Sequence, residues 1–85
     1  MVRAERIGGA VLVEVANSGG ETVLAAASVS AGRRAVGGDA RPIPPGSSET
    51  WVLPAPGDGE LVAAAYNATR GEVEDLRRVE QRRAL

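Results

Sequence analysis

The stretch AVLVEVA at residues 10–16 alternates regularly between two kinds of side chain. In an extended strand Val11, Val13 and Val15 would point to one face, and Glu14 would point to the other. This period of two, with one apolar face, is typical of a strand in an antiparallel sheet that meets water on one side. The stretch therefore predicts a β-strand that ends at the turn residues 17–20, whose letters are NSGG.

The same alternation recurs along the chain, in segments separated by Gly, Pro and Asn turn signals at intervals of roughly 8–12 residues. The positions expected to share a face are Val23, Ala25, Ala27 and Val29 in Thr22–Ser30; Glu49, Trp51 and Leu53 in Ser47–Leu53; and Leu61, Ala63 and Ala65 in Glu60–Ala68. Val2–Ile7 is expected to be a first strand and Arg34–Val36 a short edge strand. Because alanine also favours helix, a helix through Val23–Ala27 is the alternative for that segment. This regular spacing of turns is typical of an all-β sandwich or barrel.

The C-terminal segment Glu72–Leu85 admits two interpretations. Its many helix formers, with Glu74 four residues before Arg78, favour a helix. However, Val73 and Val79 lie in one strand phase, and a strand over Glu60–Ala68 needs a neighbour. We prefer a strand from about Glu72 to Val79, with Gln81–Leu85 as a basic tail or a short helical turn.

Three motifs resemble bacterial immunoglobulin-like modules, in particular the cell-adhesion-related modules of bacterial surface proteins. They are the strand at 11–17 that runs into NSGG, the run IPPGSSETWVL at 43–53, and GDGE at 57–60, which leads into 61–66. The resemblance covers roughly residues 10–68 and depends on turn chemistry. It implies an immunoglobulin-like sandwich. Together with the alternating segments, we predict an all-β, immunoglobulin-like antiparallel sandwich of six or seven strands over residues 1–79, followed by a short basic tail at 80–85.

The apolar residues of the chain are unusually small. Among its 85 residues are fifteen alanines and eleven valines, against six leucines, two isoleucines and no phenylalanine. Small chains compensate for a light core with disulfides, metals or association. Disulfides are excluded because the chain has no cysteine, and the common Cys and His ligands for zinc are missing. We therefore expect the protein to contact copies of itself or a protein partner.

The composition also limits the chemistry that the chain could perform. Without histidine and cysteine, no imidazole-based triad and no thiol nucleophile can form. Paired carboxylates remain possible, but a small Ala/Val sandwich leaves little room for a pocket around them. We predict no enzyme activity, no cofactor and no metal. Arg3, Glu5 and Arg6 follow Met1 without an apolar run, so neither export by a signal peptide nor a membrane span is expected.

Five residues are predicted to bind a partner: Trp51, Arg77, Arg78, Arg82 and Arg83. Trp51 is either a core residue or an interface anchor. The arginines make the C-terminal segment locally basic, which suits an acidic patch on a protein and also suits a tail that is simply solvated. Nucleic acid is the less favoured partner, because the net charge is −1, Glu80 interrupts the basic run, and the chain has only two aromatic residues for stacking.

Other polar clusters have simpler interpretations. Asn67-Ala68-Thr69 matches the N-glycosylation pattern, but it also suits a turn. Two acidic groups could offer oxygen ligands to a hard cation, but they also suit charged loops in water; they are Asp39, Asp58 and Glu60, and Glu72, Glu74 and Asp75. Neither group has the alternating Asp/Asn pattern of a dedicated calcium loop.

These observations together predict a non-enzymatic structural or binding protein. By analogy of fold, it resembles the small accessory proteins of tailed bacteriophages, which decorate a capsid or stiffen a tail. In that case it would lie in the virion, docked on a repeating protein lattice through an edge strand or the basic tail, or else associate with itself. The alternative is a bacterial interaction module or a small subunit of an enzyme complex, located in the cytoplasm.

Overall fold

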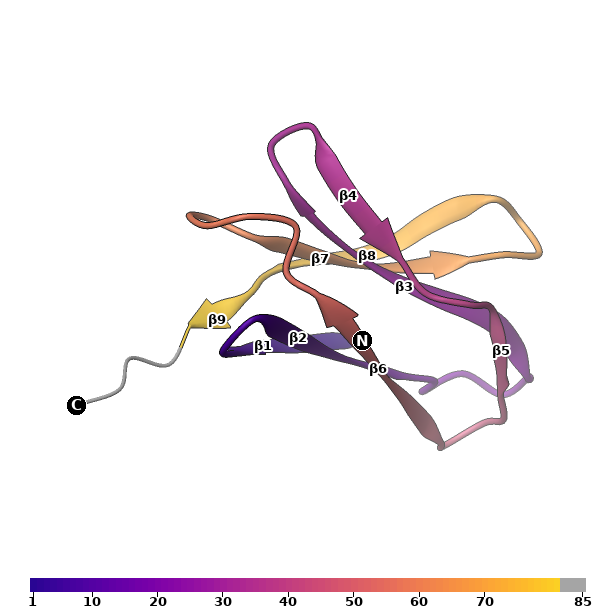
Figure 1. Cartoon of the computed structure of the whole chain (residues 1–85). Helices are drawn as coiled ribbons and strands as arrows, with labels where there is room; N and C mark the ends of the chain where they lie inside the picture. Colours follow the sequence, from indigo (N-terminus) through magenta and orange to yellow (C-terminus); the bar gives the residue numbers. More distant parts are fainter. Residues whose placement is uncertain (82–85) are drawn as a thin grey trace.

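The computed structural model describes residues 1–81, which form an all-β protein (Figure 1). Arg82 and Arg83, two of the predicted partner-binding residues, lie outside the described residues. The strands are β1 (Val2–Ile7), β2 (Ala10–Ala16), β3 (Val23–Ala31), β4 (Arg34–Gly37), β5 (Arg41–Ile43), β6 (Ser48–Pro54), β7 (Val62–Asn67), β8 (Glu72–Arg78) and β9 (Glu80–Gln81).

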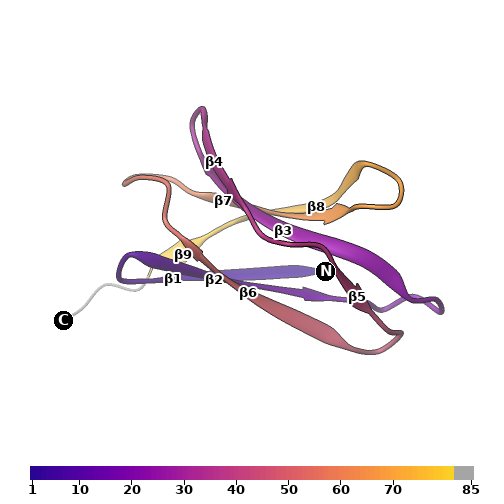
Figure 2. The ribbon, with the colours of Figure 1, turned by 45° about the vertical axis from the view of Figure 1, so that its right-hand side comes forward.

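Two sheets pack face to face, as Figure 2 shows. Sheet A has the strand order β6-β2-β1-β9, and sheet B has the order β4-β3-β7-β8, with β5 also paired to β3. All pairs are antiparallel except the short pairing of β9 with β1, which is parallel. The predicted all-β sandwich is confirmed. The alternative of a helix is wrong both for Val23–Ala27 and for the segment that forms β8.

The nine elements correspond to seven passes of the chain across the sandwich. β4 and β5 pair with successive parts of β3 and form one edge strand, interrupted at residues 38–40. β8 and β9 are separated only by Val79, where the chain leaves sheet B and joins sheet A beside β1. The sheet thus continues two residues beyond Val79, into the segment predicted to be tail.

Two hairpins depend on a glycine in the left-handed region. Gly8 (φ 61°) begins the two-residue loop between β1 and β2, and Gly32 (φ 60°) begins the loop between β3 and β4. A positive φ at the first loop residue is typical of the type II′ hairpin turn, whose twist matches that of the flanking strands. Both hairpins keep neighbouring strands in the register that the alternating sequence requires.

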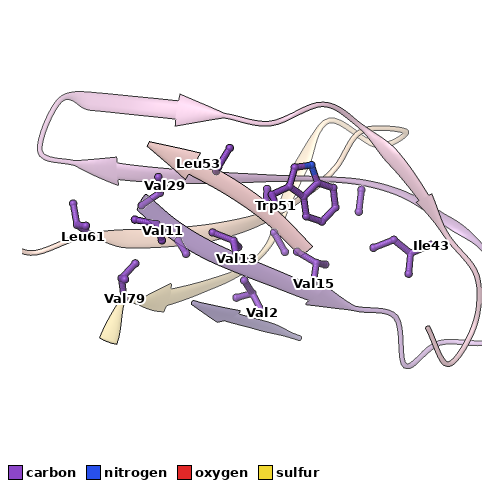
Figure 3. Packing of buried hydrophobic residues seen from close by; sticks show 14 residues of the cluster. Val2, Val11, Val13, Val15, Val29, Ile43, Trp51, Leu53, Leu61 and Val79 are labelled. Carbon is purple, nitrogen blue, oxygen red and sulfur yellow. The ribbon is translucent and has the colours of Figure 1, made fainter. Parts of the chain in front are cut away.

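The core lies between the sheets and consists of the residues that alternation predicts. Figure 3 shows side chains from both sheets pointing toward one another. The buried set is Val2, Val11, Val13, Val15, Ala25, Ala27, Val29, Ile43, Trp51, Leu53, Leu61, Ala63, Ala65 and Val79. Sheet B contributes mainly alanines, so the larger side chains of sheet A and its neighbours fill most of the interior.

One polar residue, Asn17, is buried with this core at 8% exposure. Its Nδ2 donates hydrogen bonds to the carbonyl oxygens of Glu21 (2.7 Å) and Ile43 (2.9 Å), and its Oδ1 accepts one from the Gly19 amide (2.9 Å). Asn17 thus joins the turn after β2 to the end of β5. A buried amide with every partner in place stabilises the structure, whereas an unpaired one would cost free energy.

A β-bulge in β8 changes one prediction. The register with β7 shifts between Ala65 and Tyr66, so that Tyr66 lies opposite Val73 while Ala65 lies opposite Asp75. The extra residue, Glu74, exchanges the inward-pointing and outward-pointing positions of β8 on its two sides. Val73 is therefore 55% exposed on the outside of sheet B, whereas Val79 is 4% exposed in the core. The interpretation that these two valines share one strand phase is wrong.

Candidate interaction surface

Trp51 lies in the core and not on the surface. It projects from β6 between the sheets with 1% of its area exposed (Figure 3). Its indole Nε1 donates a hydrogen bond to the Asp39 carbonyl oxygen at 2.8 Å. Gly38 allows this approach, because a Cβ at that position would lie 2.3 Å from Cδ1 of Trp51. Of the two interpretations of Trp51, the structure therefore selects core packing, and no partner can reach the ring while the fold is intact.

Asp39, between β4 and β5, and Arg41, the first residue of β5, together cover Trp51. The Arg41 guanidinium stacks above the indole ring at 4.7 Å from its centroid. The same guanidinium binds both carboxylate oxygens of Asp39 at 3.1 Å. This bidentate hydrogen bonding lowers the pKa of Asp39 below its ordinary value. The ion pair of Asp39 and Arg41 thus covers one face of the Trp51 ring. These contacts hold the indole in the core.

Arg77 and Arg78 lie on β8 and point to opposite sides of sheet B. Arg78 faces outward, and its Nε is 2.8 Å from Oε1 of Glu60. Arg77 has the inward phase, and its Nε is 4.0 Å from Oδ2 of Asp75. Both line an open groove of about 550 Å³, whose described charged side chains are Arg3, Glu5, Glu14, Arg77, Arg78 and Glu80. Three arginines against three glutamates make a surface of mixed charge.

Asp75 connects the edges of the two sheets. Its Oδ2 accepts a hydrogen bond from the Val2 amide of β1 at 3.0 Å, and its Oδ1 accepts one from the Leu76 amide at 2.9 Å. The Val2 bond is the main reason that the pKa of Asp75 lies below its ordinary value, with the Leu76 bond and the charge of Arg77 adding to it. The ionised carboxylate is therefore the form that holds β1 against β8.

This contact predicts a dependence of stability on pH. A carboxyl whose pKa is lowered by folding stabilises the native state above its unfolded pKa of about 4, and that contribution is lost as the pH falls through the folded value. We expect Asp75→Asn to be less stable than the natural protein at pH 7, with the difference shrinking as the pH drops below about 4. Thermal melts across this pH range measure the difference in stability.

Asp58→Asn is the control, because Asp58 forms only an exposed ion pair with Arg6. A difference for Asp75→Asn that is independent of pH would contradict this assignment.

The outer face of sheet B is strongly apolar. The residues of β3, β7 and β8 that point outward are Leu24, Ala26, Ser28, Ser30, Val62, Ala64, Tyr66, Val73, Leu76 and Arg78. Arg78 is the only charged residue among them. Tyr66 lies between Ala26 and Val73 in one row across the sheet, and Ala64 lies between Ser28 and Leu76 in the next. We call this set of residues the outer face of sheet B.

Several of these side chains are large and open to solvent. Leu24, Tyr66, Val73 and Leu76 are 40%, 37%, 55% and 60% exposed. The alternating pattern alone does not reveal this face, although the sequence carries a signal of it. Residues 23–27 and 61–66 are apolar in both strand phases, and such runs indicate strands that are covered on both sides.

The remaining candidates are occupied by ordinary contacts. Oδ1 of Asn67 accepts hydrogen bonds from the Thr69 and Arg70 amides, both at 3.0 Å, so Asn67 shapes the turn before β8. Asp39, Asp58 and Glu60 each pair with an arginine. Within residues 1–81 no group of three or more acidic side chains is placed to hold a metal ion. The same residues contain no helix of the length and apolarity that crossing a membrane requires.

Comparison of the chain with protein-family models, with curated proteins and with solved structures finds no match in any of the three.

Proposed function

We propose that this protein is a non-enzymatic, immunoglobulin-like binding module that docks on a protein partner through the outer face of sheet B. The observation that carries this proposal is the exposure of Leu24, Tyr66, Val73 and Leu76 on one sheet face. An antiparallel sheet with one face in water normally presents polar side chains there. A contiguous apolar face on a small protein is instead a feature of interaction sites.

The charges near this face support a protein partner over nucleic acid. Arg78, at its border, is already paired with Glu60. The groove beside β1 balances its three arginines with three glutamates, so its side chains carry no excess positive charge for phosphates. The absence of histidine and cysteine from the whole chain supports a binding role in place of a catalytic one. A tyrosine among small aliphatic residues is a suitable centre for a protein interface.

The specific form of the proposal is a virion accessory protein that docks on a repeating capsid or tail lattice. Two observations support it. The order of β6, β2 and β1 opposite β4, β3, β7 and β8 suits the immunoglobulin-like modules that the turn motifs resemble. The core is also built largely from alanine and valine, so docking would add stability by mass action.

The experiment compares two lysine substitutions on opposite faces of the sandwich. Leu24→Lys places a charge on the outer face of sheet B, and Val52→Lys is the matched control on the outer face of sheet A, where Val52 is 67% exposed. Tagged proteins are produced in the native host, and assembled particles are separated by density gradient. We expect the natural protein and Val52→Lys to sediment with capsids or tails, and Leu24→Lys to remain at the top of the gradient. If the natural protein sediments with an enzyme complex and not with particles, the viral setting is wrong. If Leu24→Lys and Val52→Lys sediment alike, the outer face of sheet B is not the docking face.

A further inference from the structure

The strand β8 ends the strand order of sheet B, so its outer side is an open edge. The Val79 amide donates to the Leu61 carbonyl oxygen at 2.8 Å, toward the side of β7. Amides alternate in direction along a strand, so those of Arg77 and Asp75 also point toward β7, and those of Leu76 and Arg78 point away from it. The contact of the Leu76 amide with Oδ1 of its own neighbour Asp75 agrees with this direction. Leu76 thus presents its backbone to the open edge.

The charges of this edge are symmetric about Leu76. Asp75 precedes Leu76 and Arg77 follows it, and both have the inward phase of sheet B, opposite Ala65 and Ala63. If a second β8 ran antiparallel with its Leu76 opposite this Leu76, each Asp75 would face the Arg77 of the other copy. Such a pairing also keeps every facing pair on the same side of the sheet, as strand geometry requires.

We propose that a second copy of this chain pairs with β8 about a two-fold axis at Leu76, which joins two sheets B into one continuous sheet. The two Leu76 residues exchange backbone hydrogen bonds, which replace the contact of each Leu76 amide with Oδ1 of Asp75. Asp75 and Arg77 form the adjacent non-hydrogen-bonded pairs, in which side chains approach most closely. On the outer side, the Leu76 side chains meet, and the 60% exposed area of each is partly covered.

The partner is a second copy because the charges of this edge disfavour pairing with most other strands. Inward-pointing charges on an edge strand discourage pairing with an ordinary apolar strand, which would cover Asp75 and Arg77 and leave each with only the other, 4.0 Å away, as its charge partner. A strand that accepts this edge needs a basic residue opposite Asp75 and an acidic residue opposite Arg77. β8 itself meets that requirement, so the same charges that reject other strands select an identical one. The bulge at Glu74 interrupts the regular ladder at one end of the pairing.

This inference does not depend on the proposed function. Leu24, the residue substituted to test docking, lies on β3, two strands away from the β8 edge. Leu24→Lys should therefore leave the dimer intact. Dimerisation would also double the outer face of sheet B within one particle, so that two weak contacts to a lattice act together.

The first experiment measures the oligomeric state of the whole chain by sedimentation velocity over a range of concentrations. The natural protein should dimerise. Arg77→Asp places aspartates opposite each other, which should weaken the dimer by on the order of tenfold or more. Arg34→Asp is the matched control, because it makes the same change on β4, the other edge of sheet B, and it should dimerise normally. A natural protein that stays monomeric, or equal association of both variants, would overturn the inference.

A mixing experiment separates charge pairing from damage to the fold. Asp75→Arg carries two basic residues around Leu76, and Arg77→Asp carries two acidic ones. Each should be monomeric alone, with folding verified by circular dichroism, and an equal mixture should form a heterodimer. If Asp75→Arg does not fold because it loses the Val2 contact, the cysteine experiment below tests the pairing of β8 without it.

The register is tested by single cysteines, since the chain contains none. Leu76→Cys should give a disulfide-linked dimer on mild oxidation, because facing residues of a hydrogen-bonded pair have Cα atoms about 5.5 Å apart, within disulfide range. Val73→Cys is equally exposed on the same strand but lies away from the axis, so it should cross-link far more slowly. Equal rates for the two cysteines would show that β8 does not pair at Leu76.

Discussion

Replacement of Trp51 with alanine should lower the free energy of unfolding by about 3–5 kcal/mol, the range for truncating a buried aromatic residue. Trp51 is 1% exposed and is the largest of the fully buried side chains. The interior of sheet B consists mainly of alanines, which cannot extend to fill the space left behind. Since small domains have a total stability of only about 5–15 kcal/mol, the variant should be close to unfolding at room temperature.

Urea denaturation followed by circular dichroism measures this effect, because the variant loses the tryptophan signal. Val52→Ala is the control: the neighbouring side chain on the same strand is 67% exposed, and its truncation should change stability by less than about 0.5 kcal/mol. Trp51→Phe should fall between the two, since it keeps an aromatic ring but loses the bond to the Asp39 carbonyl. A Trp51→Ala protein as stable as Val52→Ala would mean that the indole is not a core residue.

Replacement of Asn17 with alanine should cost about 2–4 kcal/mol, the second largest effect that we expect. The change removes both hydrogen bonds donated by Nδ2 and leaves the buried carbonyl of Ile43 without that donor. It also removes the acceptor for the Gly19 amide, which shapes the turn after β2. The loop before β6 should loosen as well, because the lost Nδ2 bond holds the Ile43 carbonyl at the start of that loop.

Asn67→Ala provides the matched control for this prediction. Asn67 also shapes a turn with its Oδ1, but its hydrogen bonds are exposed, so water can replace them. Its substitution should cost no more than about 1 kcal/mol. Hydrogen exchange of the Ile43, Gly46 and Ser47 amides gives a local measurement, with faster exchange expected in Asn17→Ala alone. Equal destabilisation by the two substitutions would show that burial of Asn17 contributes nothing.

The faces of the strands could be read from the sequence with little error. Val11, Val13 and Val15 are buried while Glu14 is not, and Ala25, Ala27 and Val29 follow the same rule. This succeeded because the side chains of a strand alternate by simple backbone geometry, whatever lies beside it. Turn positions were equally accessible, since Gly8 and Gly32 adopt the positive φ that only glycine reaches readily.

The candidate interaction surface was harder to predict. Arg77 and Arg78 were identified from local charge, but their opposite facing and their partners Asp75 and Glu60 come from the fold. Trp51 could not be assigned to core or surface until Gly38 and Arg41 were seen to cover it. Leu24, Tyr66 and Leu76 come from three strands that are distant in sequence, so their common face appears only once the strands are ordered in a sheet.

The sequence by itself determined which side chains share a face in strands such as Ala10–Ala16 and where turns such as Gly8-Gly9 fall, because these properties depend on neighbours one or two residues away. Only the tertiary structure decided which strands share a sheet, that Val79 carries the chain from one sheet to the other, and that a bulge exposes Val73. Those features depend on pairings between residues far apart along the chain. An alternating pattern allows many such pairings, and the joint packing of both sheets around Trp51 selects among them.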